Sequence, residues 1–451
     1  MSKLLEEFNI TKRKNEFIEG DYKAFRDKTL LEEFRIKILE SLSDKGFANT
    51  YIKKEIIDNE IDDATLGYSL SVSERTHLFN LIDGEVNGYG PITELLKDDN
   101  ITEIMVNSPK DIYIEIDGIL RKDESVSFIN DEHIIRTIER LIEPEGKSID
   151  INNPMVDARL SNGSRINAII PPLSKNPIIT IRKFRKNIVT MDDLIGNGSL
   201  TPYMARFLVA AIESRLNILV SGSSSGGKTS LLNILSNFIP ENDRIITIED
   251  VRELNLKQQN IVSLETKMPN YEGKGEITVR DLVRNSLRMR PDRIIIGEVR
   301  GSEAFDLLQA MNTGHDGSIT TIHANSSEDA LNRLETMVLM DGIDLPIRAV
   351  REYINNALDI VVHITRMNDG RRKITEISEI TGVKDDKIIL EKIFEFKNEG
   401  IGDNGLVQGE YILNNYIPKC LTKMHNNGIN DLDDMFAKPK KSNKKTTKKD
   451  K

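Results

Sequence analysis

The stretch SGSSSGGKTS, residues 221–230, decides the fold of the second half of this 451-residue chain. From Gly222 to Thr229 it fits the pattern G-x-x-x-x-G-K-[ST], which forms a loop whose backbone N–H groups surround phosphate. An apolar run, LNILVSG, precedes the loop, and the helix-like run KTSLLNILSNFI follows it. We therefore expect a buried strand, a phosphate-binding loop and a helix whose N-terminus adds positive potential.

The loop is expected to bind ATP through residues 222–230, namely Gly222, Ser223, Ser224, Ser225, Gly226, Gly227, Lys228, Thr229 and Ser230. Lys228 should reach the β- and γ-phosphates, and the Thr229 hydroxyl should bind Mg²⁺. Close approach to phosphate needs residues that are free to take a positive φ, and we assign that role to Gly226 and Gly227. The alternative interpretation is a serine-rich turn that a lysine happens to follow.

Strands and helices alternate regularly after residue 216. The strands are predicted at 216–222, 244–250, 293–299 and 317–324, and the helices at 228–239, 278–290, 302–312 and 326–338. Ser326 and Asp329 form a capping-box pattern at the start of the last helix. This alternation predicts an α/β domain with a mostly parallel sheet that helices cover on both faces.

Acidic side chains follow two of these strands. Glu249, Asp250 and Glu253 come at the end of one strand, and Glu298 comes at the end of another. Because ligands of parallel α/β sheets gather at the carboxyl ends of the strands, Glu298 and Glu249 are candidates to hold Mg²⁺ or to orient a water. Glu253 is a further candidate base. The alternatives are a surface acid at a strand end and a solvated loop.

His315 and His323 flank one short strand in the segment GHDGSITTIHA. The functional interpretation is that they sense the γ-phosphate, and the structural one is ordinary hydrogen bonding. Arginines gather earlier in the chain, where DARLSNGSRINAIIPP and ITIRKF contain Arg159, Arg165, Arg182 and Arg185. Their planar, permanently charged side chains suit phosphate, although ion pairs with an acidic surface would also explain them.

The pattern divides the chain into five segments. We expect a helical region at 1–75, a small α+β domain at 80–186, a linker at 187–203, the α/β domain at 204–435 and a basic, disordered tail at 437–451. Thr201 and Pro202 form a helix-start signal at the end of the linker.

Composition excludes several classes of protein. Residues 438–451 carry a net charge of +7 within a chain of net charge −10, so the body carries −17 and does not suit general nucleic-acid binding. The single cysteine, Cys420, excludes an internal disulfide and a four-cysteine zinc site. No apolar run reaches 18 residues, and the N-terminus lacks a secretory signal. We therefore expect a cytoplasmic protein.

These motifs together resemble the secretion ATPase superfamily that powers type II secretion, type IV pili and type IV secretion. Its blocks match GYGPITELL, EIMVNSP, DARLSNGSRINAIIPP, RMRPDRIIIGEVRG and AMNTGHDGSITTIHANS, and the resemblance is greatest to Tad/Flp pilus assembly ATPases of the CpaF type. By this resemblance, 222–230 is the Walker A motif, 247–253 the aspartate box, 293–298 the Walker B motif and 314–323 the histidine box.

The resemblance implies a RecA-like ATPase domain behind a PAS-like N-terminal domain, assembled as a homo-hexameric ring. Nucleotide would lie between the two domains of a subunit, and Arg165 and Arg182 would close the site. A membrane platform protein would hold the ring at the cytoplasmic face of the inner membrane. The loop departs from the family's usual GGTGSGKTT, because Ser225 stands where glycine is expected and Gly226 where serine is expected.

Three functions remain open on these grounds. The leading hypothesis is an ATP-hydrolysing motor for pilus assembly, with a conjugative or type IV secretion ATPase as the alternative. A nucleic-acid translocase would keep the same fold, but the acidic body and the lack of an aromatic-basic stripe argue against it. A nucleotide switch that does not hydrolyse would account for the exchanged loop residues.

Overall fold

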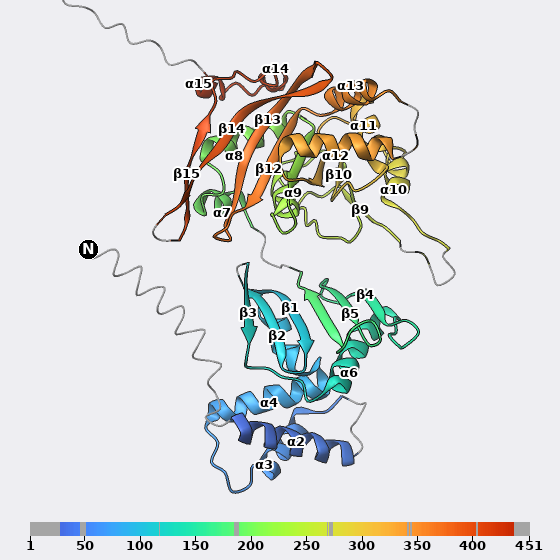
Figure 1. Cartoon of the computed structure of the whole chain (residues 1–451), viewed down its shortest axis with the longest axis vertical. Coiled ribbons are helices and arrows are strands. Elements are labelled where there is room, and N and C mark those ends of the chain that lie inside the picture. Colours follow the sequence, from blue (N-terminus) through green and yellow to red (C-terminus); the bar gives the residue numbers. More distant parts are fainter. Residues whose placement is uncertain are drawn as a thin grey trace, which may run out of the picture. The chain divides into compact units, whose positions relative to one another are not determined.

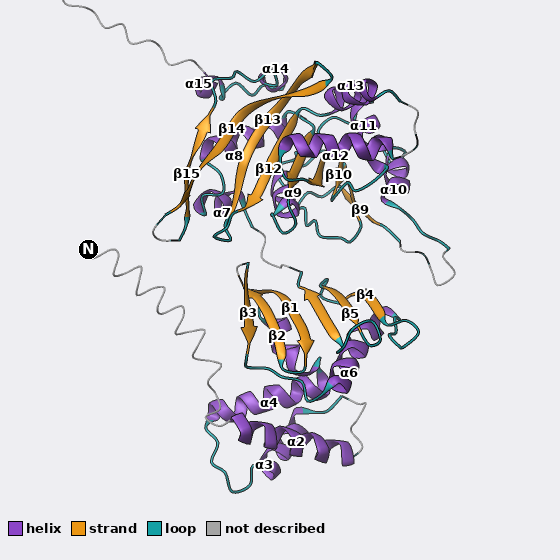
Figure 2. Ribbon diagram, in the orientation of Figure 1, coloured by secondary structure: helices purple, strands orange, loops and turns teal. Residues whose placement is uncertain are grey.

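A computed structural model describes residues 28–45, 51–116, 118–184, 189–267, 269, 274–340, 342, 345–402 and 405–436. The chain divides into two compact units, Met1–Ile188 and Val189–Lys451 (Figures 1 and 2). The basic tail expected at 437–451 and Arg185 lie outside the described residues. Within the described ranges, no helix is both long and apolar enough to cross a membrane.

The first unit begins with three helices, α2 (Lys28–Asp44), α3 (Lys54–Ala64) and α4 (Val72–Asn87). Their apolar faces form one core, which includes Phe34, Ile38, Ile57, Ile61, Leu78 and Ile82. Ser71 caps α4 by accepting from the backbone N–H of Glu74, whose carboxylate accepts from Ser71 in return. The bundle therefore continues past residue 75, where we expected the helical region to end.

The rest of the first unit is an antiparallel sheet with helices against one face. Its elements are η1 (Gly90–Ile92), α5 (Thr93–Lys97), β1 (Ile101–Ser108), β2 (Asp111–Ile116), β3 (Ile119–Asp123), α6 (Asp131–Ile142), η2 (Glu143–Glu145), β4 (Met155–Arg159), β5 (Arg165–Ile169) and β6 (Ile178–Arg182). The strand order is β3-β2-β1-β6-β5-β4. Alternate residues such as Ile104, Ile166 and Ile181 are buried in its core.

The second unit contains a larger, mixed sheet. Its strands are β7 (Ile218–Gly222), β8 (Ile245–Glu249), β9 (Ile261–Glu265), β10 (Arg293–Ile296), β11 (Ile319–His323), β12 (Ile360–Arg366), β13 (Arg372–Lys384), β14 (Lys387–Ile401) and β15 (Val407–Leu413). Their order is β15-β14-β13-β12-β7-β11-β10-β8-β9. The strands from β12 to β9 pair in parallel, and β13, β14 and β15 extend the sheet with antiparallel pairing.

Helices cover both faces of this sheet, as Figure 2 shows. They are α7 (Met191–Gly196), α8 (Pro202–Glu213), α9 (Lys228–Ser236), α10 (Val279–Ser286), α11 (Glu303–Asn312), α12 (Ser327–Leu339), α13 (Ile347–Ala357), α14 (Leu421–Asn426) and α15 (Asp433–Phe436). One apolar core joins a face of the sheet to α8, α9 and α14, and another joins the opposite face to α11, α12 and α13. The expected α/β class with a mostly parallel, doubly covered sheet is confirmed.

Local details refine the expected element boundaries. The segment 187–203, which we expected to be a linker, contains α7, and Thr190 caps this helix by accepting from Asp193 N–H. Thr201 caps α8 as predicted. Ser326 also caps α12, but the Asp329 carboxylate accepts from the Asn325 N–H at 2.9 Å, so the reciprocal bond of the capping box reaches one residue further back.

Candidate nucleotide site

Strand register brings the predicted motifs to one edge of the sheet. β7 ends at Gly222, the first residue of the loop, and Gly222 pairs with His323, the last residue of β11. Glu298 follows β10 by two residues, and Glu249 is the last residue of β8. Because these strands are parallel neighbours, their carboxyl ends meet beside the start of α9, where a phosphate chain would bind.

The loop reaches its shape through a residue that the sequence did not single out. Positive φ values occur at Ser225 (55°) and Gly227 (97°), whereas Gly226 has none. Our assignment of positive φ to Gly226 was therefore wrong, because the left-handed turn lies one residue earlier. The Ser225 backbone is held there from outside the loop, since Nε of Arg372, on β13, donates to its carbonyl oxygen at 3.2 Å.

Gly226 is required for space rather than for φ. A Cβ atom at this position would lie 2.9 Å from the backbone oxygen of Ser223, which is closer than real Cβ contacts. The Gly226 N–H donates to that same oxygen at 3.2 Å and closes the turn. In this chain, serine thus occupies the position with a positive φ, Ser225. Glycine occupies the position that has no room for a Cβ atom, Gly226.

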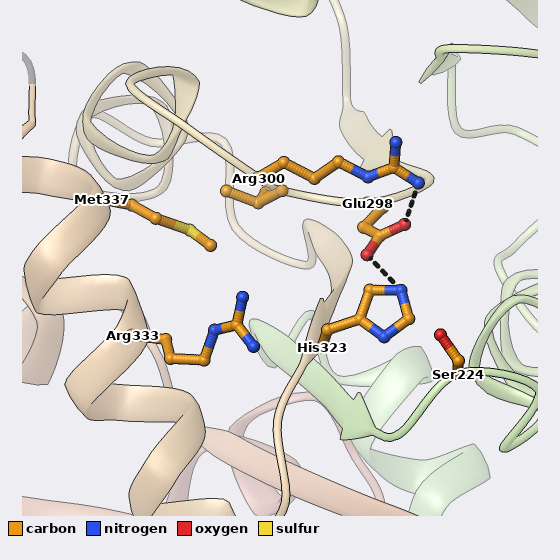
Figure 3. Close-up of a pocket in the computed structure, with 7 residues that line it drawn as sticks. Ser224, Glu298, Arg300, His323, Arg333 and Met337 are labelled. Carbon is orange, nitrogen blue, oxygen red and sulfur yellow. Dashed lines mark hydrogen bonds and ion pairs between the residues drawn. The ribbon is translucent and has the colours of Figure 1, made fainter. Parts of the chain in front are cut away.

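Lys228, His323 and Glu298 are joined by two polar contacts, a hydrogen bond from Lys228 to His323 and a close contact of the imidazole with the Glu298 carboxylate, and Figure 3 shows the second of them. The buried Lys228 ammonium lies 3.0 Å from Ser223 O and 3.0 Å from Nδ1 of His323. Because the ammonium can only donate, Nδ1 accepts and the ring proton sits on Nε2. Nε2 in turn lies 2.8 Å from Oε1 of Glu298. Burial and the charge of Lys228 lower the pKa of His323, which favours this neutral form.

The second oxygen of Glu298 is held by an arginine. NH2 of Arg300 lies 2.7 Å from Oε2 of Glu298, and NH1 of the same side chain lies 3.2 Å from Oδ2 of Asp250. The hydrogen bond to Glu298 raises the pKa of Arg300. Arg300 therefore joins the acid that follows β10 to the one that follows β8.

Glu249 occupies a different environment from Glu298. It is only 4% exposed, and its Oε1 accepts from the N–H groups of Glu253 (2.9 Å) and Leu254 (3.0 Å). Desolvation by burial raises its pKa to about 7. Gly297 makes room for it, because a Cβ at Gly297 would lie 3.1 Å from Cγ of Glu249. This packing gives a physical reason for a glycine directly before Glu298.

The donors at this edge fit Mg²⁺ bound together with a nucleotide. Mg²⁺ commonly takes one or two protein oxygens and fills its shell with phosphate oxygens and water. Oε2 of Glu249 is buried and has no hydrogen-bond partner among the described residues, so it can accept from a metal-bound water. Thr229 lies in the first turn of α9 and is partly exposed. No group of three or more His, Cys, Asp or Glu in the described ranges could hold a metal without a nucleotide.

A cavity of about 470 Å³ lies beside Glu298 (Figure 3). It is lined by Ser224, Glu298, Val299, Arg300, His323, Arg333 and Met337. Ser224 contributes from the loop, and Arg333 and Met337 contribute from α12. The cavity therefore connects the phosphate-binding loop with α12, whose Arg333 and Met337 the sequence analysis did not assign to the site.

His315 lies at the other end of β11 from His323, Glu253 adjoins Glu249, and the predicted arginines belong to the first unit. His315 precedes β11, at the end opposite His323, and its Nδ1 lies 3.2 Å from Ala310 O at the end of α11. Glu253 contributes its backbone N–H to Glu249. Arg165 and Arg182 belong to the first unit, where they form a directly paired row on β5 and β6 with Arg159 on β4.

Several contacting residues were missed by the sequence reasoning. Arg300 and Arg333 line the cavity, Arg372 holds the loop, and Nδ1 of His363 lies 2.8 Å from the Ser221 hydroxyl at the end of β7. Arg300 could have been found, because it follows Glu298 by two residues. Arg372 and His363 could not, because β12 and β13 reach the loop only through sheet pairing.

Comparison with known proteins gives one family. Residues 85–398 match the family described as type II/IV secretion system protein. A putative conjugal transfer protein of Mycobacterium tuberculosis is 33% identical over 305 residues, which cover 66% of this chain and 86% of that protein. The type IV secretion system protein VirB11 of Bartonella henselae is 32% identical over 328 residues, covering 64% and 90%.

A solved structure with a similar sequence is the VirB11 ATPase of the Brucella suis type IV secretion system in complex with sulphate. It is 32% identical, the match covers 64% of this chain and 94% of that chain, and the TM-score is 0.35.

Proposed function

The chain belongs to the type II/IV secretion system protein family and is a P-loop ATP hydrolase, and on that premise we propose that it is the motor of a pilus-assembly or type IV secretion machine. The observation that carries the proposal is the pair of contacts that links Lys228 through His323 to Glu298. They connect the residue expected on the β- and γ-phosphates with the carboxylate that we propose acts on water.

Each side chain has a role that its contacts support. Lys228 exchanges Ser223 O and His323 for phosphate oxygens when ATP binds. Glu298 orients the attacking water and accepts its proton, and His323 stays close to the carboxylate, with Nε2 2.8 Å from Oε1. The Thr229 hydroxyl and, through a water, Glu249 would hold Mg²⁺, which would supply positive charge to the phosphates. Glu253 positions Glu249 through its backbone N–H.

The motor works as a homo-hexameric ring. Arg165 and Arg182 lie side by side on β5 and β6, where their two side chains can approach one phosphate chain together. In the ring, these arginines stabilise the charge of the transferring phosphoryl group, and the cycle of binding and hydrolysis moves one unit of the chain against the other. His315 contributes to the nucleotide site only through the packing of β11.

The motor acts at the cytoplasmic face of the inner membrane, through a membrane platform protein. The family blocks around GYGPITELL and AMNTGHDGSITTIHANS favour assembly of a Tad/Flp-type pilus. The conjugal transfer and VirB11 relatives support a conjugative or type IV secretion machine to about the same degree. Neither reading requires direct binding of nucleic acid.

Two measurements test the proposal. The full chain should hydrolyse Mg-ATP, and Lys228→Ala should abolish turnover, with exposed Lys257→Ala as a matched control that retains it. Unchanged turnover in Lys228→Ala would mean that this loop is not the phosphate site. Deleting the gene in its host then separates the machines, because a pilus motor removes surface fibres and a conjugative motor removes DNA transfer. ATPase activity that rises on adding DNA would instead favour a translocase.

A further inference from the structure

We infer that the cavity beside Glu298 is a binding site for inorganic phosphate and that Arg333 is the residue that binds it. The phosphate is the one released from ATP, so this inference rests on the proposed hydrolysis. Arg333 thereby controls how phosphate leaves the site after the bond to ADP has broken.

Arg333 is placed to do this by α12. The helix begins at Ser327, soon after β11 ends at His323, so its second turn faces the same strand edge. Figure 3 shows the Arg333 guanidinium directed into the cavity, across from His323 and Glu298. Met337, one turn further along α12, lines the cavity next to it.

The charge of Arg333 is not used elsewhere in the described part of the chain. No hydrogen bond or ion pair joins it to another described residue, and it is exposed. The neighbouring basic groups differ. Arg300 is paired with Glu298 and Asp250, and Lys228 is bonded to Ser223 and His323. The charge of Arg333 also contributes to the lowered pKa of His323, so its field reaches the site.

The lining of the cavity suits a small oxyanion. Arg333 and Arg300 are permanent cations, the Ser224 hydroxyl is a further donor, and Glu298 is the one carboxylate among the residues that line it. A guanidinium presents parallel N–H groups that match two phosphate oxygens. No Phe, Tyr or Trp side chain lines the cavity, which therefore lacks the large aromatic surface on which bases usually stack.

The position favours the released phosphate over the phosphate still attached to ATP. Lys228 contacts Nδ1 of His323 from the start of α9, whereas Arg333 lines the cavity from α12, and the cavity extends to Ser224 of the loop. Hydrolysis breaks the bond between the γ-phosphorus and the bridging oxygen, which stays with ADP, and the water oxygen becomes part of the phosphate. The product can then move away from Lys228 towards Arg333.

Equilibrium dialysis of labelled inorganic phosphate against the Mg-ADP-saturated full chain tests this directly. We expect the parent to bind phosphate and Arg333→Gln to bind it at least about tenfold more weakly, since a charge-assisted bond to one oxyanion is lost. Arg333→Lys keeps the charge without the fork and should lie between them. Arg348→Gln, an exposed arginine on α13 away from the cavity, should match the parent.

Three results would overturn the inference. They are a parent that binds no phosphate beside ADP, an Arg333→Gln variant that binds phosphate as the parent does, and an equal loss in Arg348→Gln. A higher KM for ATP in Arg333→Gln, with unchanged affinity for free phosphate, would mean that Arg333 binds the phosphate while it is still part of ATP. This result would also contradict the inference. Dialysis measures phosphate binding and needs no turnover. A chain that hydrolyses no ATP would contradict the proposed function, and this result is distinct from a failure to bind phosphate.

Discussion

The ammonium group of Lys228 lies 3.0 Å from Nδ1 of His323, and this contact assigns the histidine proton to Nε2. Nε2 of His323 faces Oε1 of Glu298 at 2.8 Å, a close polar contact that lacks hydrogen-bond geometry. Lys228 is hydrogen-bonded to Ser223 O and to His323. Under the proposed function, Lys228 would exchange these contacts for phosphate oxygens, and His323 would connect that exchange with Glu298.

Glu298→Gln should retain ATP binding and slow hydrolysis by at least about a hundredfold, the lower range for loss of a general base. The amide cannot accept a proton, and its NH₂ group would face the donors of Arg300 or His323. Turnover and the Kd of a fluorescent ATP analogue should be measured together. Glu352→Gln, at an exposed position on α13, is a control whose turnover should be close to that of the parent. Equal losses of binding and rate in Glu298→Gln would indicate a structural role.

Ser225→Gly should tighten nucleotide binding modestly and leave folding intact. Ser225 holds a φ of 55°, which costs a non-glycine residue roughly 1 kcal/mol. Gly226→Ser should raise the KM for ATP at least about tenfold, equivalent to roughly 1.4 kcal/mol, because its Cβ would meet Ser223 O at 2.9 Å. The KM values of both variants, together with their melting temperatures, check the prediction.

The double variant Ser225→Gly/Gly226→Ser tests whether the two positions compensate for each other. We expect it to recover part of the loss, because glycine at 225 lets the turn move away from the new side chain. A harmless Gly226→Ser would show that the loop tolerates the contact and that our account of the exchange is wrong.

Glu249 should make stability depend on pH. Its folded pKa is about 7, against 4.5 for a free side chain, so the folded state binds more protons than the unfolded state between these values. The free energy of unfolding should therefore fall as pH rises from 4.5 to 7. Relative to Glu249→Gln, the parent should lose up to about 3 kcal/mol between pH 5 and pH 8.

Denaturant unfolding of the parent and of Glu249→Gln, at both pH values and without nucleotide, measures this difference. Subtracting the variant removes the titration of all other groups. A difference that stays constant with pH would mean that Glu249 is ionised throughout the range. ATPase activity that rises through pH 7 in the parent would further connect the charged form with metal binding.

Arg165→Ala and Arg182→Ala should each cut hydrolysis by at least about tenfold, a cautious floor under the range for arginine fingers. The melting temperature should stay within a few degrees, because this row alternates with the buried residues Ile166 and Ile181 and faces away from their core. Turnover per protein should also increase with protein concentration as rings form.

Arg121→Ala, at an exposed position on β3 of the same sheet, is the matched control and should retain activity. Full activity in a monomeric preparation, or in either arginine variant, would show that the second unit hydrolyses ATP alone. The arginines would then serve only as ion-pair partners.

The sequence by itself determined the α/β class and the place of the nucleotide loop. Local patterns predict both features. Neighbouring residues alone are enough to recognise the apolar run at 216–222, the glycines around Lys228 and the periodic helix at 228–239. The same holds for the caps at Thr201 and Ser326, which depend on residues three positions away. Glu298 could be proposed because parallel strands share one functional edge.

Tertiary structure alone decided which side chains meet at that edge. The bond between Lys228 and His323 joins residues 95 positions apart, and Arg372 reaches Ser225 across 147 positions. The tertiary structure also determines that the left-handed turn lies at Ser225 and that Arg333 is directed into the cavity. It places His315 at the opposite end of β11 from His323. Sheet order and helix direction determine these contacts, and both arise from packing two apolar cores rather than from any local pattern.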